Sequence, residues 1–345
     1  MNEIMGYKIT GKPNYALFAV LLLILTASAF LLIWQLGGFG SGTGIIPMGA
    51  PAISDGVRRQ IDGAYVARGK ENAPLYAVVI DNNISARPLS GLAKASLVYE
   101  APVEGGITRL LAIFDAGRDI REIGPIRSAR PYFIDLAGEF GALFTHVGGS
   151  PAAMERLKAG AAGIVNLDLY YTGSFYWRDS KRSAPHNVYT SSKFLADAAE
   201  VHKLGVPLYD SWQFKSDAAL EYRPEKNEIT VAAVQSEYTV RWVYNKAHNS
   251  YFRYHGEKLE RGKDGGIVSA KNVVVLKTDI EIIDAITRRE IRTTGEGEAT
   301  VFRGGAATVA RWKKADVGSR LKFYDESGAE IAFNAGPTWI EIVPK

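Results

Sequence analysis

The chain has 345 residues, of which 47% are apolar and 23% are charged, a composition typical of a folded protein rather than a disordered one. Its net charge is +4, far from the concentrated positive charge of a nucleic-acid-binding protein. Cysteine is absent, which excludes disulfides, thiolate metal ligands, a cysteine nucleophile and a lipid attached through an N-terminal cysteine. Any membrane tether must therefore be the polypeptide itself.

The first predicted element is a transmembrane helix at residues 15–36. The run from Ala16 to Trp34 holds nineteen residues without a charge, and at about 1.5 Å per residue it matches a hydrocarbon core about 30 Å thick. Lys8 and Lys12 precede the run, and no charge follows it until Asp55. The positive-inside rule then puts residues 1–14 in the cytoplasm and the globular body outside a single-pass cell membrane anchor.

The alternative is a cleaved signal peptide, because Ala27-Ser28-Ala29 has the small-x-small form of a cleavage site. Cleavage there would leave the apolar run Phe30 to Trp34 at the new N-terminus, so we favour a retained helix. Residues 37–51 are glycine-rich and uncharged, which predicts a flexible spacer, and we expect residues 63–74 to extend it as a poorly structured lead-in.

Residues 75–217 are predicted to form an α/β domain. Strands are expected at 76–80, 97–100 and 109–115, and helices at 131–140 and 150–158, the second with Ser150 as its N-cap. The texture changes near residue 218, where short strand-like runs alternate with turn signals. Residues 218–345 are therefore predicted to form a smaller, mainly β domain, with a hairpin turn at 295–298.

Arginine is concentrated in one part of the chain. Residues 87–182 hold nine Arg and three Lys, whereas the rest holds thirteen Arg and sixteen Lys. Arginine is preferred where a phosphate or carboxylate is held by planar, bidentate contact, so we expect an arginine-rich cleft that binds an anion. The alternative is a set of internal ion pairs with Glu100, Glu104, Asp115 and Asp179. The candidate ligand-binding residues are Arg87, Arg109, Arg127, Arg130, His146, Arg178, Arg182 and Asn187.

Two further features concern chemistry. His146 precedes Gly148-Gly149 and a helix entry, where backbone N–H groups can cradle an anion, although the same glycines also suit an ordinary helix start. Glu104, Asp179 and His186 are the candidate general bases. No histidine pair has metal-ligand spacing and no nucleophile elbow or phosphate loop is present, so neither a metal nor a cofactor is predicted.

A set of longer motifs resembles the bacterial YerB-type lipoprotein family. The motifs are VVIDNNISARPLSGLAKASLVYEAPVEGGITRLLAIFD, IGPIRSARPYFIDLA, HVGGSPAA and WRDSKRSAPHNVYT, followed in the second half by AKNVVVL, GEGEATVFRGG and GPTWIEIVP. The resemblance covers nearly the whole chain from Tyr76 onward. The family is one of unknown function, so the resemblance implies an architecture and a location but no reaction. Lipoprotein members carry a lipidated cysteine, and here a transmembrane helix takes its place.

The chain is also similar, more loosely, to cell-wall glycopolymer transferases of the LytR-CpsA-Psr type. Arg109 before a strand, Arg127 after the next one and Gly148-Gly149 at a helix entry follow the order of that family. There the arginines hold a polyprenyl pyrophosphate, and neighbouring Asp residues support Mg²⁺. The neighbours of both arginines here are not acidic, so the similarity implies anion binding and leaves metal-assisted transfer in doubt.

Three functional hypotheses follow. The first is a membrane-anchored protein that binds an anionic cell-envelope ligand, bearing phosphate or carboxylate, in the arginine-rich cleft. The second is a phosphotransferase or phosphoesterase that acts on lipid-linked or cell-wall glycopolymer substrates in that cleft. The third is a non-catalytic envelope assembly scaffold whose arginine–carboxylate pairs stiffen the fold. The predicted partners are the membrane and the anionic ligand, with no nucleic acid; protein partners are unknown from the sequence.

Overall fold

A computed structural model describes residues 56–345 of the chain. They belong to one compact unit, Ile53–Lys345, which has its own hydrophobic cores and which we call the body. The predicted transmembrane helix and residues 37–51 of the predicted spacer lie outside the described residues. Among residues 56–345, no helix is long and apolar enough to cross a membrane.

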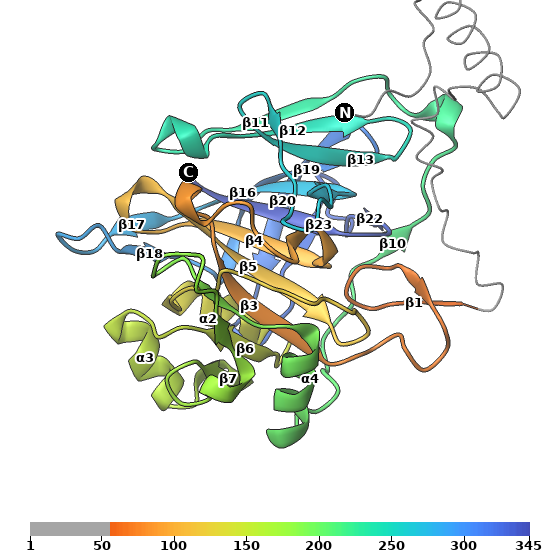
Figure 1. The fold of residues 1–345 in the computed structure, drawn as a ribbon. Coiled ribbons are helices and arrows are strands. Elements are labelled where there is room, and N and C mark those ends of the chain that lie inside the picture. Colours follow the sequence, from red (N-terminus) through yellow and green to blue (C-terminus); the bar gives the residue numbers. More distant parts are fainter. Residues whose placement is uncertain (1–55) are drawn as a thin grey trace, which may run out of the picture. The chain divides into compact units, whose positions relative to one another are not determined.

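The body is mostly β-structure with few helices (Figure 1). The elements of the first half are β1 (Val57–Arg58), β2 (Tyr65–Val66), β3 (Leu75–Asp81), β4 (Leu97–Pro102), β5 (Thr108–Asp115), α2 (Pro131–Gly138), β6 (Leu143–His146), α3 (Pro151–Lys158), β7 (Val165–Asp168), β8 (Trp177–Arg178), β9 (Val188–Tyr189) and α4 (Ser192–Val201). Those of the second half are β10 (Phe214–Lys215), β11 (Glu228–Val231), β12 (Val240–Asn245), β13 (Ser250–His255), β14 (Lys258–Leu259), β15 (Ser269–Ala270), β16 (Asn272–Thr278), β17 (Ile280–Ile282), β18 (Arg289–Ile291), β19 (Gly295–Arg303), β20 (Ala306–Lys314), β21 (Lys322–Tyr324), β22 (Phe333–Asn334) and β23 (Thr338–Pro344).

One ten-stranded sheet runs through both halves, in the order β21-β20-β19-β16-β23-β4-β5-β3-β6-β7. The last strand of the chain, β23, lies between β16 and β4 and pairs in parallel with both. Strands β3, β6 and β7 are also parallel, and β5 runs antiparallel to both β4 and β3. Seven strands (β20, β16, β23, β4, β3, β6 and β7) therefore point the same way, and their carboxyl ends share one edge of the sheet.

Both faces of the sheet are covered, which explains the near-continuous apolar runs in its central strands. On one face, Phe133 of α2 and Leu157 of α3 belong to the same core as Leu111 of β5. On the other face, Leu195 of α4 and Trp242 belong to a second core, together with the residues of β5 that alternate with Leu111. Trp242 belongs to a separate five-stranded sheet formed by β11 to β15. The sheet is thus held between two packed layers.

The three strands predicted in the first half are present as β3, β4 and β5, and the two helices as α2 and α3. Ser150 is the N-cap of α3 and accepts a hydrogen bond from the backbone N–H of Ala153. The expected hairpin turn at 295–298 is wrong, because these residues belong to strand β19. The chain reverses instead at Gly304-Gly305, between β19 and β20.

The predicted flexible lead-in is also wrong for residues 63–74. They include β2, which pairs with β1 to form a hairpin. The segment is fixed by buried charges: Arg59 lies 2.5 Å from Asp62 and 2.9 Å from Asp115, and Asp62 accepts a hydrogen bond from Ser96. Because the partners lie on β5 and next to β4, this short hairpin is tied to the central sheet.

Candidate functional site

The carboxyl edge of the sheet gathers most of the polar residues that the sequence analysis singled out. Strand β3 ends there at Asp81, β6 at His146 and β7 at Asp168, while β5 begins there with Thr108 and Arg109. Asp81 and Arg109 are direct partners in the β3–β5 ladder. In open sheets of this kind ligands bind outside the carboxyl ends of the parallel strands, so this edge is the natural place to look for a site.

Asp81 organises the first group of side chains, Asp81, Arg127 and His186, which we call the Asp81 cluster. Its Oδ2 lies 2.6 Å from Nδ1 of His186 and 3.2 Å from Nε of Arg127. Asp81 is buried, whereas the His186 side chain is 19% exposed. Within residues 56–345, Nε2 of His186 has no hydrogen-bond partner. The carboxylate therefore fixes the imidazole and leaves its second nitrogen toward solvent, the arrangement of an oriented acid–base group.

Arg109 is the exceptional member of this edge. Its side chain is buried, with 4% of the residue exposed, and Nη1 donates to the carbonyl of Ser128 at 2.8 Å. No carboxylate within the described part of the chain lies within 4 Å of it. Burial, followed by repulsion from Arg130 and Arg127, lowers the pKa of Arg109 to about 10. Relative to an ordinary arginine, the charged form of Arg109 is thus destabilised by about 3 kcal/mol.

Arg130 is adjacent but already neutralised. Its Nε and Nη2 donate to the two oxygens of Glu104 at 2.7 and 2.6 Å, a bidentate pair. Although burial alone raises the pKa of Glu104, these hydrogen bonds hold it below the ordinary value. Glu104 is therefore a fixed counter-ion rather than a free base.

A further arginine joins this group from the second half of the chain. Arg289 opens β18, its Nε is buried without a hydrogen-bond partner, and no carboxylate lies within 4 Å of it among residues 56–345. Burial raises the pKa of the Tyr132 hydroxyl, and the charges of Arg109, Arg130 and Arg289 all oppose that rise, so all three guanidinium groups lie within electrostatic range of this hydroxyl. We call Arg109, Arg130, Arg289 and Glu104 the arginine site. The sequence analysis missed Arg289, since no local signal links residue 289 to residues 104–130.

At the predicted anion cradle, the His146 ring and the Gly148 N–H are engaged in hydrogen bonds within the protein. The ring is buried, and its two nitrogens lie 2.7 Å from the Gly148 carbonyl and 2.7 Å from Oδ1 of Asn166. The N–H of Gly148 donates to Oδ1 of Asp168 at 2.9 Å. The imidazole and the Gly148 N–H thus have structural partners, which is the alternative that the sequence had left open.

Arg182 and Arg87 have structural contacts outside both groups. Arg182 donates to the carbonyls of Ala86 and Pro88 at 2.7 and 3.3 Å. Arg87 donates to Oδ1 of Asn82 at 2.9 Å. These bonds support the loop that follows β3, directly beside Asp81, without placing either guanidinium in the arginine site.

The loop that carries His186 is flanked by three further predicted site residues, Arg178, Asp179 and Asn187. Arg178 is exposed and donates to Oδ1 of Asn187 at 3.0 Å. Asp179 faces Lys263 of the second half, with an Oδ2–Nζ distance of 3.6 Å. Its pKa lies below the ordinary value because it accepts a backbone hydrogen bond, with Lys263 adding to the effect. Among the three predicted bases, His186 alone combines an orienting partner with an unbonded reactive nitrogen.

A pair of buried acids lies on neighbouring strands of the same sheet. Glu100 of β4 and Glu341 of β23 are direct partners in the ladder. Glu100 accepts from Arg253 at 2.7 Å, and Arg253 also binds Glu260. Glu341 accepts from the indole N–H of Trp242 at 2.8 Å. Burial and the neighbouring Glu100 raise the pKa of Glu341 well above its ordinary value, which favours its protonated form. This network joins the two halves of the chain.

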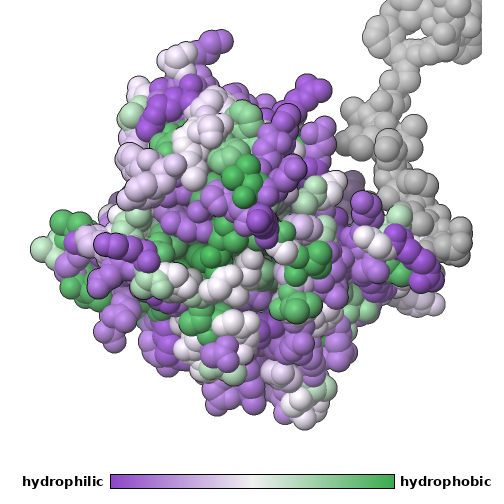
Figure 2. Space-filling model, turned by 90° about the horizontal axis from the view of Figure 1, so that it is seen from below, coloured by the Kyte–Doolittle hydropathy of each residue, from purple (hydrophilic) through white to green (hydrophobic). Residues whose placement is uncertain are grey.

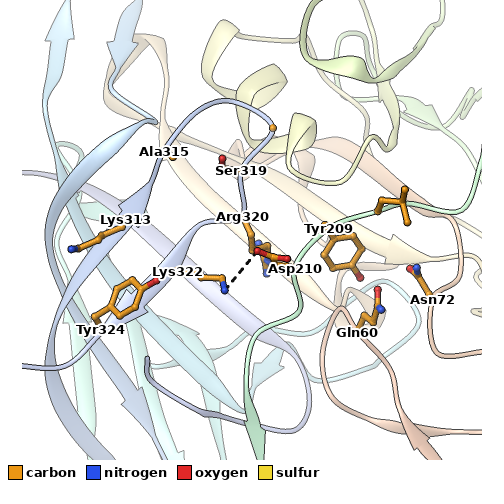
Figure 3. A pocket seen from close by; sticks show the side chains of 12 residues that line it. Gln60, Asn72, Tyr209, Asp210, Lys313, Ala315, Ser319, Arg320, Lys322 and Tyr324 are labelled. Carbon is orange, nitrogen blue, oxygen red and sulfur yellow. Dashed lines mark ion pairs between the residues drawn. The ribbon is translucent and has the colours of Figure 1, made fainter. Parts of the chain in front are cut away.

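An open hollow of about 730 Å³ lies elsewhere, between the N-terminal hairpin and strands β20 and β21 (Figure 3). It contains none of the predicted site residues. Its deepest cation, Arg320, is paired with Glu139 at 2.5 Å, and Lys322 lies between Asp210 and Glu330 at 3.8 and 3.3 Å. Because these cations already have acidic partners, the unpaired arginines of the carboxyl edge are the stronger candidate for ligand chemistry.

Comparison with known proteins matches both halves. Residues 63–205 match the family described as "Protein of unknown function (DUF3048) N-terminal domain", and residues 229–340 match the corresponding C-terminal domain. The chain is 35% identical over 271 residues to the protein named "Putative lipoprotein YerB" of Bacillus subtilis (strain 168), covering 78% of this chain and 80% of that protein.

A solved structure shares the fold. The crystal structure of the YerB protein from Bacillus subtilis superposes with a TM-score of 0.74 at 30% identity, covering 84% of this chain and 97% of that one. Two matched family domains, an extended sequence relationship and a shared fold agree, and the chain belongs to the DUF3048 family of two-domain, YerB-like proteins of unknown function.

Proposed function

We propose that this protein is tethered to the membrane and binds an anionic cell-envelope ligand, bearing phosphate or carboxylate, at the arginine site. The observation that carries the proposal is Arg109, a buried guanidinium without a carboxylate partner in the described chain. A buried charge of this kind is costly unless a counter-ion arrives. A bound anion would supply that counter-ion.

The remaining residues give the site its shape. Arg130 is fixed by Glu104 and forms a rigid wall beside Arg109. Arg289 brings a second guanidinium without a carboxylate partner among residues 56–345. Counting Glu104 against Arg130 leaves Arg109 and Arg289 uncompensated, so the arginine site suits a ligand with one or two negative charges. Two guanidinium forks match the oxygens of a phosphate group or a carboxylate.

The extracytoplasmic location is supported by the relative and by the sequence. The related Bacillus protein bears the name "Putative lipoprotein YerB", and a lipoprotein has a body held at a membrane from outside. This chain has no cysteine and carries a charge-free apolar run at residues 16–34, which serves the same purpose as a transmembrane segment. The body would then meet envelope components rather than cytoplasmic metabolites.

A second candidate function, hydrolysis or transfer of a phosphate ester, is favoured by the Asp81 cluster. The 2.6 Å contact between Asp81 and His186 orients an imidazole whose Nε2 is unbonded within the described residues. Such a group can accept a proton from water or from a hydroxyl. Because repulsion from Arg127 contributes to the lowered pKa of Arg109, the Asp81 cluster and the anion site are electrostatic neighbours, as a reacting phosphate would require.

Calorimetric titration of the body with inorganic pyrophosphate tests the proposal. We expect binding in the wild type, at least a tenfold loss of affinity in Arg289→Met and no change in Arg311→Met, a matched control whose side chain is 56% exposed and paired with Glu296. Equal affinity in all three proteins would contradict the arginine site. Incubation with a lipid-linked pyrophosphate, with and without Mg²⁺, separates the candidates, because binding without turnover rejects the enzyme.

A further inference from the structure

A narrow hairpin projects from the carboxyl edge, formed by β17 and β18 (Figure 1). Its tip carries three isoleucines, Ile282, Ile283 and Ile286, which are 56%, 53% and 63% exposed; we call them the isoleucine tip. The turn is held by Asp284, whose Oδ1 accepts from the backbone N–H groups of Ile286 and Arg288 at 3.1 and 3.0 Å. A hydrogen-bonded turn thus holds the isoleucines in solvent.

The isoleucine tip adjoins the loop that holds Glu104, and that loop in turn adjoins a further exposed apolar residue. The N–H of Gly105 donates to Oγ1 of Thr287 at 2.9 Å, next to Ile286. On its other side the loop contacts Val234, which is 81% exposed, and the Gln235 amide donates to the Gly105 carbonyl. Figure 2 shows hydrophobic residues at the end of the molecule from which the hairpin projects in Figure 1, as well as over the centre of that face. Exposed aliphatic groups thus border the arginine site.

We propose that the isoleucine tip inserts into the surface of an anionic lipid bilayer and sets the arginine site against the lipid headgroups. This inference rests on the proposed membrane tether. Exposed aliphatic groups on a projecting turn, backed by cations, are the combination that binds at a membrane interface. Arg289 follows the tip directly and lies opposite Ile282 in the hairpin ladder, so insertion of the tip brings a guanidinium to the depth of the phosphates.

The chain that precedes the body favours a bilayer over another occupant. The apolar run ends at Trp34, and the roughly 20 residues between it and the body can reach no more than about 70 Å, the limit set by a fully extended chain. The body is then kept close to the lipid surface, where even a weak contact is populated because of its high effective concentration. The net charge of +4 is complementary to anionic headgroups.

The experiment is sedimentation of the body with lipid vesicles. One set of vesicles contains roughly 30% phosphatidylglycerol in phosphatidylcholine, which supplies anionic headgroups. The other set contains phosphatidylcholine alone and is neutral. The test variant is Ile282→Ser/Ile283→Ser/Ile286→Ser. The matched control is Val309→Ser, which removes an equally exposed aliphatic group from β20.

We expect the wild type and the Val309→Ser control to bind the anionic vesicles, with at least a tenfold loss in the triple variant and weaker binding to neutral vesicles. Equal binding of the triple variant, absence of binding by the wild type, or equal binding to both vesicle types would overturn the inference. Pyrophosphate titration of the triple variant keeps the two proposals distinct: unchanged affinity for pyrophosphate shows that the arginine site survives when membrane docking is lost.

Discussion

Replacing Glu341 by glutamine should make the body more stable at alkaline pH. Glu341 is buried on β23, opposite Glu100, and hydrogen-bonds Trp242. Burial and the charge of Glu100 keep its folded-state pKa well above the ordinary value of 4.5. The folded state therefore binds a proton that the unfolded state releases above that value. Glutamine has the same shape and removes the need for the proton.

The sign and size of the effect follow from proton linkage. Where the folded state holds one proton more than the unfolded state, the free energy of unfolding falls by about 1.4 kcal/mol per pH unit. For Glu341 this window opens near 4.5 and closes at its raised folded-state pKa. Other titrating groups cancel when the variant is compared with the wild type. The advantage of Glu341→Gln should thus be smallest near pH 5 and grow by up to about 1.4 kcal/mol per pH unit within the window.

Urea unfolding of the body between pH 5 and pH 9 measures this difference. The control is Glu298→Gln, since Glu298 is 72% exposed and its contact with Lys277 is 3.3 Å; its stability curve should run parallel to that of the wild type. If the Glu341→Gln curve were also parallel to the wild type, Glu341 would be ionised in the folded protein. The account of the buried network between the two halves would then be wrong.

Three other substitutions give separate tests. Glu104→Gln leaves Arg130 without a carboxylate, so we expect a loss of roughly 2–3 kcal/mol in urea unfolding together with tighter pyrophosphate binding; unchanged affinity would argue against a shared electrostatic site. Asp62→Ala removes the buried acid of the N-terminal hairpin and should cost roughly 3 kcal/mol and make residues 57–74 sensitive to limited proteolysis, so an unaltered cleavage pattern would refute the anchoring role. Gly297→Ala places a Cβ about 2.5 Å from the indole nitrogen of Trp312, which should cost roughly 1–3 kcal/mol in urea unfolding, whereas wild-type stability would show that the indole can move.

The local signals of the sequence were sufficient for the central strands and for two helices. Apolar runs such as residues 76–80 and 109–115 predicted buried strands, and Ser150 marked the start of α3. Two segments gave misleading signals. The glycines at 295–298 looked like a turn, but they belong to a strand. Gly297 is a glycine there because Trp312 packs where a side chain would be. The lead-in looked unstructured, but the buried pair of Arg59 and Asp62 fixes it.

The site was harder to predict because its parts are distant in sequence. The concentration of arginine pointed to Arg109, Arg127 and Arg130, and all three lie on the carboxyl edge. Which of them is neutralised depends on pairs such as Arg130 with Glu104, a geometry that spacing along the chain does not contain. Arg289 reaches the site through the β17–β18 hairpin, nearly at the other end of the chain. The insertion of β23 beside β4 was equally invisible, since sheet order is set by tertiary packing.

The most direct test of the account is the stability of Arg109→Met with and without pyrophosphate. Without the anion, the variant should be more stable than the wild type by roughly 2 kcal/mol, because relief of the buried charge outweighs loss of one hydrogen bond to Ser128. Saturating pyrophosphate should stabilise the wild type and leave the variant unchanged. A variant that is destabilised without the anion, yet responds to pyrophosphate as the wild type does, would contradict anion binding at Arg109.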